Sequence, residues 1–184
     1  TWPTDQRAFS LPLQPGSLIL RQSGGAGPWA TVAVRAAVPL RQPLAAGYRL
    51  SRKVEPVQVR TPGQITRGDV LRVTLTVDAS AERSWVVVSD PVPSGATVIG
   101  TLGGQSAMLA EGGSDTSQPS YTERRDGSWR GYFAWLPRGR TSVSYTVRLN
   151  NPGRFGLPPA RVEAMYSPAI HAALPVAPVT IAAR

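Results

Sequence analysis

The sequence has 184 residues, which is enough for one domain, or for one domain with a fragment of another, and enough to bury a core. It contains no cysteine, which excludes a disulfide, a zinc–thiolate site, an iron–sulfur cluster and a cysteine nucleophile. The formal net charge is +9, but the arginines are scattered and lack interleaved aromatic residues, so we expect no nucleic-acid partner.

No run of apolar residues approaches the roughly 20 that a membrane-spanning helix needs, so we expect no direct membrane insertion by this chain. The opening residues, Thr1 to Asp5, resemble neither a signal peptide nor a natural start. We therefore expect a piece of a longer protein, in which any export signal or lipid anchor would lie upstream.

Residues 1–42 are predicted to be a separate, strand-rich piece. One strand is expected at residues 31–38, and the segment from Gln42 to Gly47 has the composition of a connector. Because two or three strands cannot form a stable domain alone, this piece must pack on the remainder or on a partner. The main domain is predicted to span residues 43–184.

The main domain continues with a strand at 54–60 and a strongly alternating one at 71–77, where apolar and polar residues take opposite faces. Residues 85–88 are continuously apolar, which predicts a strand covered on both faces, with Trp85 inside. A turn at 90–95 should follow, in which Asp90 accepts backbone hydrogen bonds.

After a short strand at 97–100, residues 101–120 are predicted to form a long exposed excursion. Further strands are expected at 129–136, 142–149, 161–166 and 176–182. Many short strands separated by glycine and proline turns, with no convincing amphipathic helix, predict an all-β fold: an antiparallel β-sandwich with a short N-terminal strand-rich piece.

Few residues suggest catalysis. His171, the only histidine, has no nearby Asp or Cys and is interpreted as a surface-loop residue rather than a catalytic or metal-binding one. Asp90, Glu123 and Glu163 are the best candidates for a glycosidase-type carboxylate pair, although local pairing of the two glutamates with arginines is the simpler interpretation. No metal site or cofactor is expected.

The five tryptophans could belong to a sandwich core or to an exposed platform that stacks on sugar rings. Trp85 and Trp135 are predicted to lie inside. For Trp29 and for Trp129, a core position and a surface position are about equally compatible with the sequence. A carbohydrate-binding module would require these two to be exposed and coplanar.

Several blocks of the sequence resemble the C-terminal, macroglobulin-like region of bacterial alpha-2-macroglobulins, in the order found in that family. They cover roughly residues 25–170 and include Gly27-Pro28-Trp29, Gly47-Tyr48-Arg49, Gly68-Asp69-Val70, Trp85-Val86-Val87, Leu136-Pro137-Arg138-Gly139 and Met165-Tyr166-Ser167-Pro168. The sequence departs from the family pattern after Pro168, at Ile170-His171-Ala172. Residues 1–42 resemble the returning half of the connector domain that flanks the thioester domain.

The resemblance implies a non-catalytic module of a periplasmic protease inhibitor that traps proteases, with a lipoprotein anchored to the inner membrane as one form of the parent. Its thioester would lie in an upstream helical domain around a Cys-Xaa-Glu-Gln motif that this chain lacks. The expected partners are other domains of the same polypeptide, especially the thioester domain, and target proteases through the full-length protein.

Within that resemblance, the module packs against the thioester domain and helps to shield it, since a lasting thioester needs water excluded. Tyr166, Tyr132, Trp29 and Trp129 are the candidate interdomain contacts, with a contribution from the 101–120 excursion. The alternatives are a carbohydrate-binding β-sandwich and a hydrolase with a carboxylate pair.

Overall fold

The computed structural model describes residues 39–101, 118–125 and 127–183, with scattered short pieces before residue 34. The chain divides into two units, residues 1–37 and 38–184, of which the second is described here. Most of the predicted strand at 31–38 and of the 101–120 excursion lies outside the described residues. The division at residue 42 and the connector-domain assignment stay predictions.

The described residues form twelve strands and no helix, so none of them forms a helix that could cross a membrane. In chain order the strands are β1 (Leu44–Ala46), β2 (Tyr48–Gln58), β3 (Val70–Ala79), β4 (Arg83–Pro91), β5 (Thr97–Thr101), β6 (Tyr121–Arg125), β7 (Ser128–Leu136), β8 (Gly139–Arg148), β9 (Gly153–Phe155), β10 (Ala160–Ala164), β11 (His171–Leu174) and β12 (Val179–Ile181).

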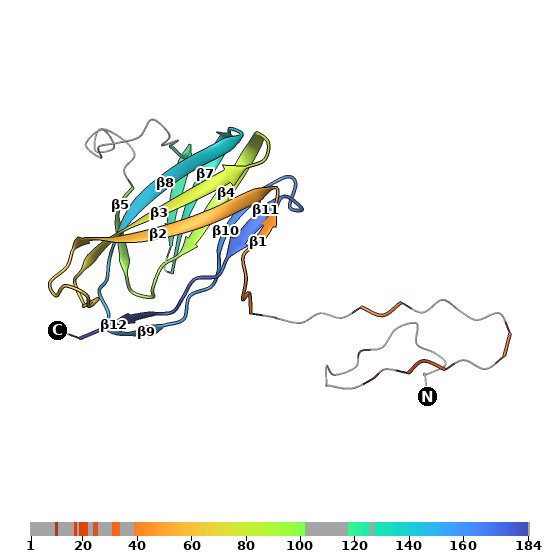
Figure 1. The fold of residues 1–184 in the computed structure, drawn as a ribbon, viewed down its shortest axis with the longest axis horizontal. Coiled ribbons are helices and arrows are strands. Elements are labelled where there is room, and N and C mark those ends of the chain that lie inside the picture. The colour runs from red at the N-terminus through yellow and green to blue at the C-terminus, as the bar shows by residue number, and fades with distance from the viewer. Residues whose placement is uncertain are drawn as a thin grey trace. The chain divides into compact units, whose positions relative to one another are not determined.

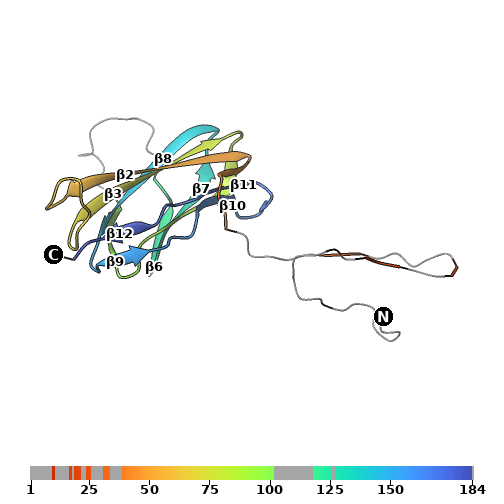
Figure 2. The same ribbon diagram turned by 60° about the horizontal axis from the view of Figure 1, so that its bottom comes forward.

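The strands form two main antiparallel sheets that face each other (Figure 1). One sheet has six strands in the order β1-β11-β10-β4-β7-β6, and the other has four in the order β2-β3-β8-β5. A small third sheet pairs β12 with β9, close to the C-terminal end of the chain (Figure 2). The all-β sandwich expected from the sequence is confirmed.

The alternating segments became the central strands of the four-stranded sheet. β3 pairs with β8 over its whole length, with Leu75 opposite Val143 and Val73 opposite Tyr145. These apolar side chains point into the core. On the outer face, the hydroxyl groups of Thr74 and Ser144 form a hydrogen bond with their oxygens 2.8 Å apart. The alternation of apolar and polar residues in the sequence therefore predicted both the strands and the face that each one buries.

Several features were not predicted, among them the short strands β1, β6 and β9. The strand expected at 54–60 begins earlier, at Tyr48, and β11 forms where the sequence departs from the family pattern. β1 continues into β2 through Gly47, so the chain crosses from one sheet to the other. Gly47 has a φ of +86°, and a Cβ atom there would lie 2.7 Å from Ile170 Cγ2, so this crossing requires glycine.

A single carboxylate connects the two sheets across the core. Asp90, on β4, is fully buried and accepts hydrogen bonds from Arg52 Nε on β2 at 2.9 and 3.0 Å. Tyr145, on β8, donates its hydroxyl proton to the same carboxylate at 2.5 Å. The prediction that Asp90 serves a turn by accepting backbone hydrogen bonds is wrong, because its side chain points inward from the strand before the turn.

Burial raises the pKa of Asp90, although Arg52 and the Tyr145 hydroxyl act to lower it. Burial and the neighbouring Asp90 charge likewise raise the pKa of Tyr145. A carboxylate removed from water in this way depends on its partners, because an unpaired buried charge is strongly destabilising.

We predict that Asp90→Ala lowers the free energy of unfolding by about 3 kcal/mol, because it leaves Arg52 without its counter-ion. Tyr145→Phe should cost about 1 kcal/mol, since the ion pair remains. Glu55→Ala, which removes the exposed Lys53–Glu55 pair on the same strand as Arg52, is the control and should change stability by less than about 0.5 kcal/mol. Urea denaturation measures all three, and an Asp90→Ala effect no larger than the control's would contradict the prediction.

A second buried carboxylate organises the turn before β3. Asp69 accepts hydrogen bonds from the Thr66 amide at 2.8 Å, the Thr66 hydroxyl at 3.0 Å and the Arg60 amide at 3.2 Å. Burial acts to raise the pKa of Asp69, but these hydrogen bonds outweigh it and hold the pKa below the ordinary 3.8. The ionised form is therefore the one that the folded state favours.

Because the pKa of Asp69 is lower in the folded than in the unfolded chain, its contribution to stability is present above its ordinary pKa and is lost as the pH falls through the folded value. We predict that Asp69→Asn is less stable than the parent sequence at about pH 7, and that the difference shrinks below about pH 4. Urea denaturation across this range measures it; a difference that stays constant down to about pH 3 would exclude the carboxylate charge as the cause.

Candidate interdomain surface

The outer face of the six-stranded sheet presents a continuous row of side chains. Register places His171 beside Glu163, Glu163 beside Val87, and Val87 beside Tyr132. Tyr121, on the edge strand β6, completes the row beside Tyr132, and the two rings lie 5.8 Å apart at 38°. The row runs over β11, β10, β4, β7 and β6, so the surface is broad.

Tyr132, one of the predicted contact residues, lies half-buried on this face. Its hydroxyl group donates to Glu123 Oε2 at 3.0 Å, and the same glutamate pairs with Arg125 and, at 3.4 Å, with Arg130. The hydrogen bond from Tyr132, followed by the two arginines, lowers the pKa of Glu123. The expected local pairing of Glu123 with an arginine is confirmed, and Tyr132 is held in place by that cluster.

Tyr166 lies in the turn between β10 and β11 and is 79% exposed, more than any other large apolar residue that the structure describes. The turn around it is closed by backbone hydrogen bonds. Ser167 N–H donates to Ala164 C=O at 2.9 Å, and Ile170 N–H donates to Ser167 C=O at 2.8 Å. A rigid turn therefore presents an exposed aromatic ring, as a contact residue requires.

His171 lies on β11, not in a loop as predicted, and it is half-buried next to Glu163. Its Nδ1 atom lies 2.9 Å from the Pro168 carbonyl oxygen, which ties the strand to the turn that carries Tyr166. From His171 the chain returns along β10 and β1 as β11.

Trp129 does not belong to this surface, since its side chain is fully buried and stacks on Tyr145 with centroids 4.9 Å apart. A Cβ atom at Gly131 would lie 2.6 Å from Trp129 Cη2, so the glycine makes room for the indole. The prediction of Trp129 as an interdomain contact is wrong for this reason. Trp29 lies outside the described residues.

The predicted burial of Trp85 and Trp135 is also wrong: the two residues are 53% and 56% exposed. Val86 and Val88 point into the core, so alternation along β4 directs Val87 and Trp85 outward, and the run at 85–88 is not covered on both faces. On β7, Ala134 and Trp135 are both exposed between buried Phe133 and Leu136. Strand pairing, which the sequence alone does not reveal, was needed to assign these positions.

The candidate carboxylates do not form a catalytic pair. Asp90 lies on the inner face of β4, whereas Glu123 and Glu163 lie on the outer face of the same sheet, separated by β4 and β7. In the part of the chain that the structure describes, no three His, Cys, Asp or Glu residues are grouped as metal ligands would be. Two shallow hollows, lined largely by arginines and polar residues, lie near Arg49 and near Arg60, away from the tyrosines of the surface.

The chain matches curated relatives over most of its length, although it spans less than a tenth of theirs. It is 28% identical over 131 residues to the alpha-2-macroglobulin of Xylella fastidiosa, covering 66% of this chain and 8% of that protein. With the alpha-2-macroglobulin of Pasteurella multocida it shares 27% identity over 133 residues, covering 72% of this chain and 7% of that protein.

Solved structures share the fold. The crystal structure of native Escherichia coli alpha-2-macroglobulin, from domain MG7 to the C-terminus, superposes with a TM-score of 0.65 at 22% identity, covering 79% of this chain and 25% of that one. Salmonella alpha-2-macroglobulin reacted with methylamine gives 0.61 at 20% identity, covering 76% and 9%. The family model of the bacterial alpha-2-macroglobulin MG10 domain matches residues 47–169, which is most of the chain, and the chain therefore belongs to the family of bacterial alpha-2-macroglobulin MG10 domains.

Proposed function

We propose that this chain is a non-catalytic module of a periplasmic alpha-2-macroglobulin that traps proteases, and that the module packs against the thioester domain and shields it from water and small nucleophiles. The observation that carries the proposal is the exposed Tyr166 on its rigid turn, in a domain of this family. Such a ring can cover a neighbouring group without rearrangement of the backbone.

The chemistry of a thioester supports this role. An amine opens a thioester by attack on its carbonyl carbon, so the group survives only where water and amines have no access. A structural neighbour, Salmonella alpha-2-macroglobulin, has been crystallised after reaction with methylamine. The broad outer face and the absence of a catalytic pair among the described carboxylates favour a covering module over an enzyme.

We predict that Tyr166→Ala in the full-length parent accelerates inactivation by methylamine by roughly tenfold, which corresponds to the loss of about 1.4 kcal/mol of contact free energy. Val57→Ala is the control, because Val57 is 51% exposed on β2, a strand of the other sheet. Its inactivation rate should stay within about twofold of the parent's, because a surface substitution away from the candidate contact has little effect. The rate of thiol release measures both.

Protease trapping by the same variants gives a second measurement. The parent should protect a large protein substrate from an added protease, and premature loss of the thioester in Tyr166→Ala should weaken covalent capture of that protease. If Tyr166→Ala reacts with methylamine at the parent's rate, the Tyr166 turn does not shield the thioester.

A further inference from the structure

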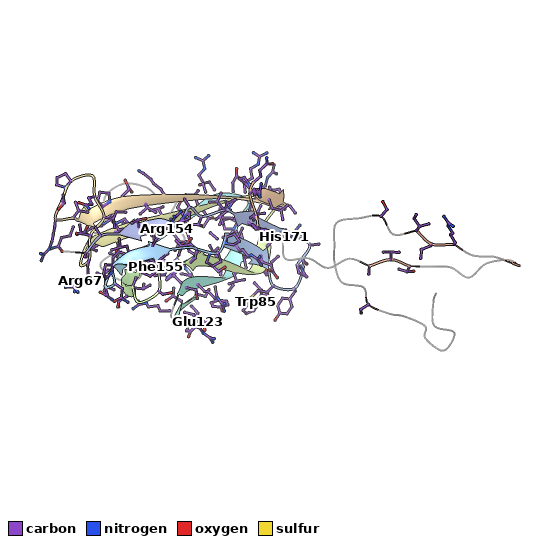
Figure 3. The ribbon with its side chains drawn as sticks, turned by 90° about the horizontal axis from the view of Figure 1, so that it is seen from below. Arg67, Trp85, Glu123, Arg154, Phe155 and His171 are labelled. Carbon is purple, nitrogen blue, oxygen red and sulfur yellow. The ribbon has the colours of Figure 1, made fainter. Side chains whose placement is uncertain are left out.

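Three exposed apolar residues gather near one end of the six-stranded sheet. Trp85, Trp135 and Met165, here called the tryptophan patch, are 53%, 56% and 44% exposed. Their backbones lie on adjoining strands or, for Met165, directly after one: Trp135 is opposite Ser84, the residue before Trp85, and Met165 N–H donates to the Trp85 carbonyl oxygen at 2.8 Å. Figure 3 shows Trp85 toward the end of the sandwich at which His171 also lies.

The backbone at Trp85 is strained. Its φ is 56°, and among the described residues it is the one non-glycine residue with a positive φ. A bulky residue in this region is a steric outlier that the rest of the structure must stabilise. The ring gains little in return within this chain, because more than half of it remains in water. Strain that supports an exposed side chain is typical of a functional site.

We propose that the tryptophan patch is the anchor that docks this module into an apolar depression on a neighbouring domain of the same polypeptide. Tryptophan is enriched among the residues that dominate interface energetics, and methionine adapts its shape to a partner surface. The curated relatives are more than ten times longer than the matched segment. The neighbouring domain would therefore belong to the same polypeptide, which gives it a high effective concentration.

The patch also lies beside the turn that carries Tyr166, since Met165 directly precedes that residue. In identifying the docking partner as the thioester domain, the inference rests on the proposed function. The two sites have separate tasks: the tryptophan patch supplies the binding free energy, and docking there holds the Tyr166 turn in its covering position. Loss of the patch should therefore weaken docking, whereas loss of Tyr166 should mainly expose the thioester.

Hydroxyl-radical footprinting of the full-length parent tests the docking directly, because Trp, Met and Tyr side chains oxidise according to their exposure. Trp85, Trp135 and Met165 should oxidise at least about fivefold more slowly in the parent than in the 184-residue chain, as expected for residues at the centre of an interface. Val57, which is 51% exposed on β2 of the other sheet, also reacts with hydroxyl radicals and serves as the internal control. It should oxidise within about twofold of the same rate in both proteins. Equal rates for the patch in the two proteins would overturn the proposal.

Two variants identify the partner. Trp85→Asn removes the indole but keeps a residue that tolerates positive φ, and Trp135→Ser removes the second ring. Each should raise the Kd for the separately expressed thioester-bearing region at least about tenfold by calorimetry. Val57→Ser, at a residue 51% exposed on β2, should leave the Kd unchanged. Thermal melts should show the same folded state for all three variants.

The outcomes separate the two proposals. Protection of the patch in the parent, with a methylamine rate that Tyr166→Ala does not change, upholds docking and overturns shielding. If the patch is unprotected in the parent but Tyr166→Ala increases the methylamine rate, shielding is upheld and docking is overturned. Binding of a glycan, or a dimer of the 184-residue chain, that depends on Trp85 and Trp135 while the patch stays unprotected in the parent would overturn docking in favour of that ligand.

Discussion

The two sheets of this sandwich are held together by a contact that would be unfavourable if any of its members were missing. Asp90 of the six-stranded sheet is fully buried and is satisfied entirely by Arg52 and Tyr145 of the four-stranded sheet. Because a buried carboxylate needs these partners at hydrogen-bond distance, it restricts how the two sheets can shift against each other. The hydrophobic cluster around it is apolar and less directional.

The aromatic part of the core follows from this constraint. The hydroxyl group of Tyr145 is committed to Asp90, and its ring forms the platform on which Trp129 stacks, in the space that Gly131 leaves open. Trp129 fills the interior at this level, while Trp85 and Trp135 stay at the surface. The same sheet thus has a buried aromatic face that stabilises the fold and an outer face that is available for docking.

The candidate surface was only partly predictable. Tyr166 and Tyr132 were identified through a family resemblance and are found on the surface, whereas Trp129 was assigned to it and is core. Parity along the strand accounts for Trp85, which alternates with buried Val86, but not for Trp135. Trp135 shares the parity of buried Phe133 and is exposed because the alternation breaks at Ala134, near the end of β7. Positive φ at Trp85 and the hydrogen bond from Met165 have no signature in sequence, since both arise from contacts between distant strands.

The sequence by itself determined the class of fold. Period-two alternation at 71–77 and 142–149, and the glycine and proline turns between strands, specify half-buried antiparallel strands whatever their neighbours. It also determined the chemistry that is missing, through the lack of cysteine. Only the tertiary structure decided which strand pairs with which, that Asp90 points into the core, that His171 begins a strand, and that two tryptophans meet solvent. These features depend on contacts between residues far apart in the chain, whose energies no local pattern contains.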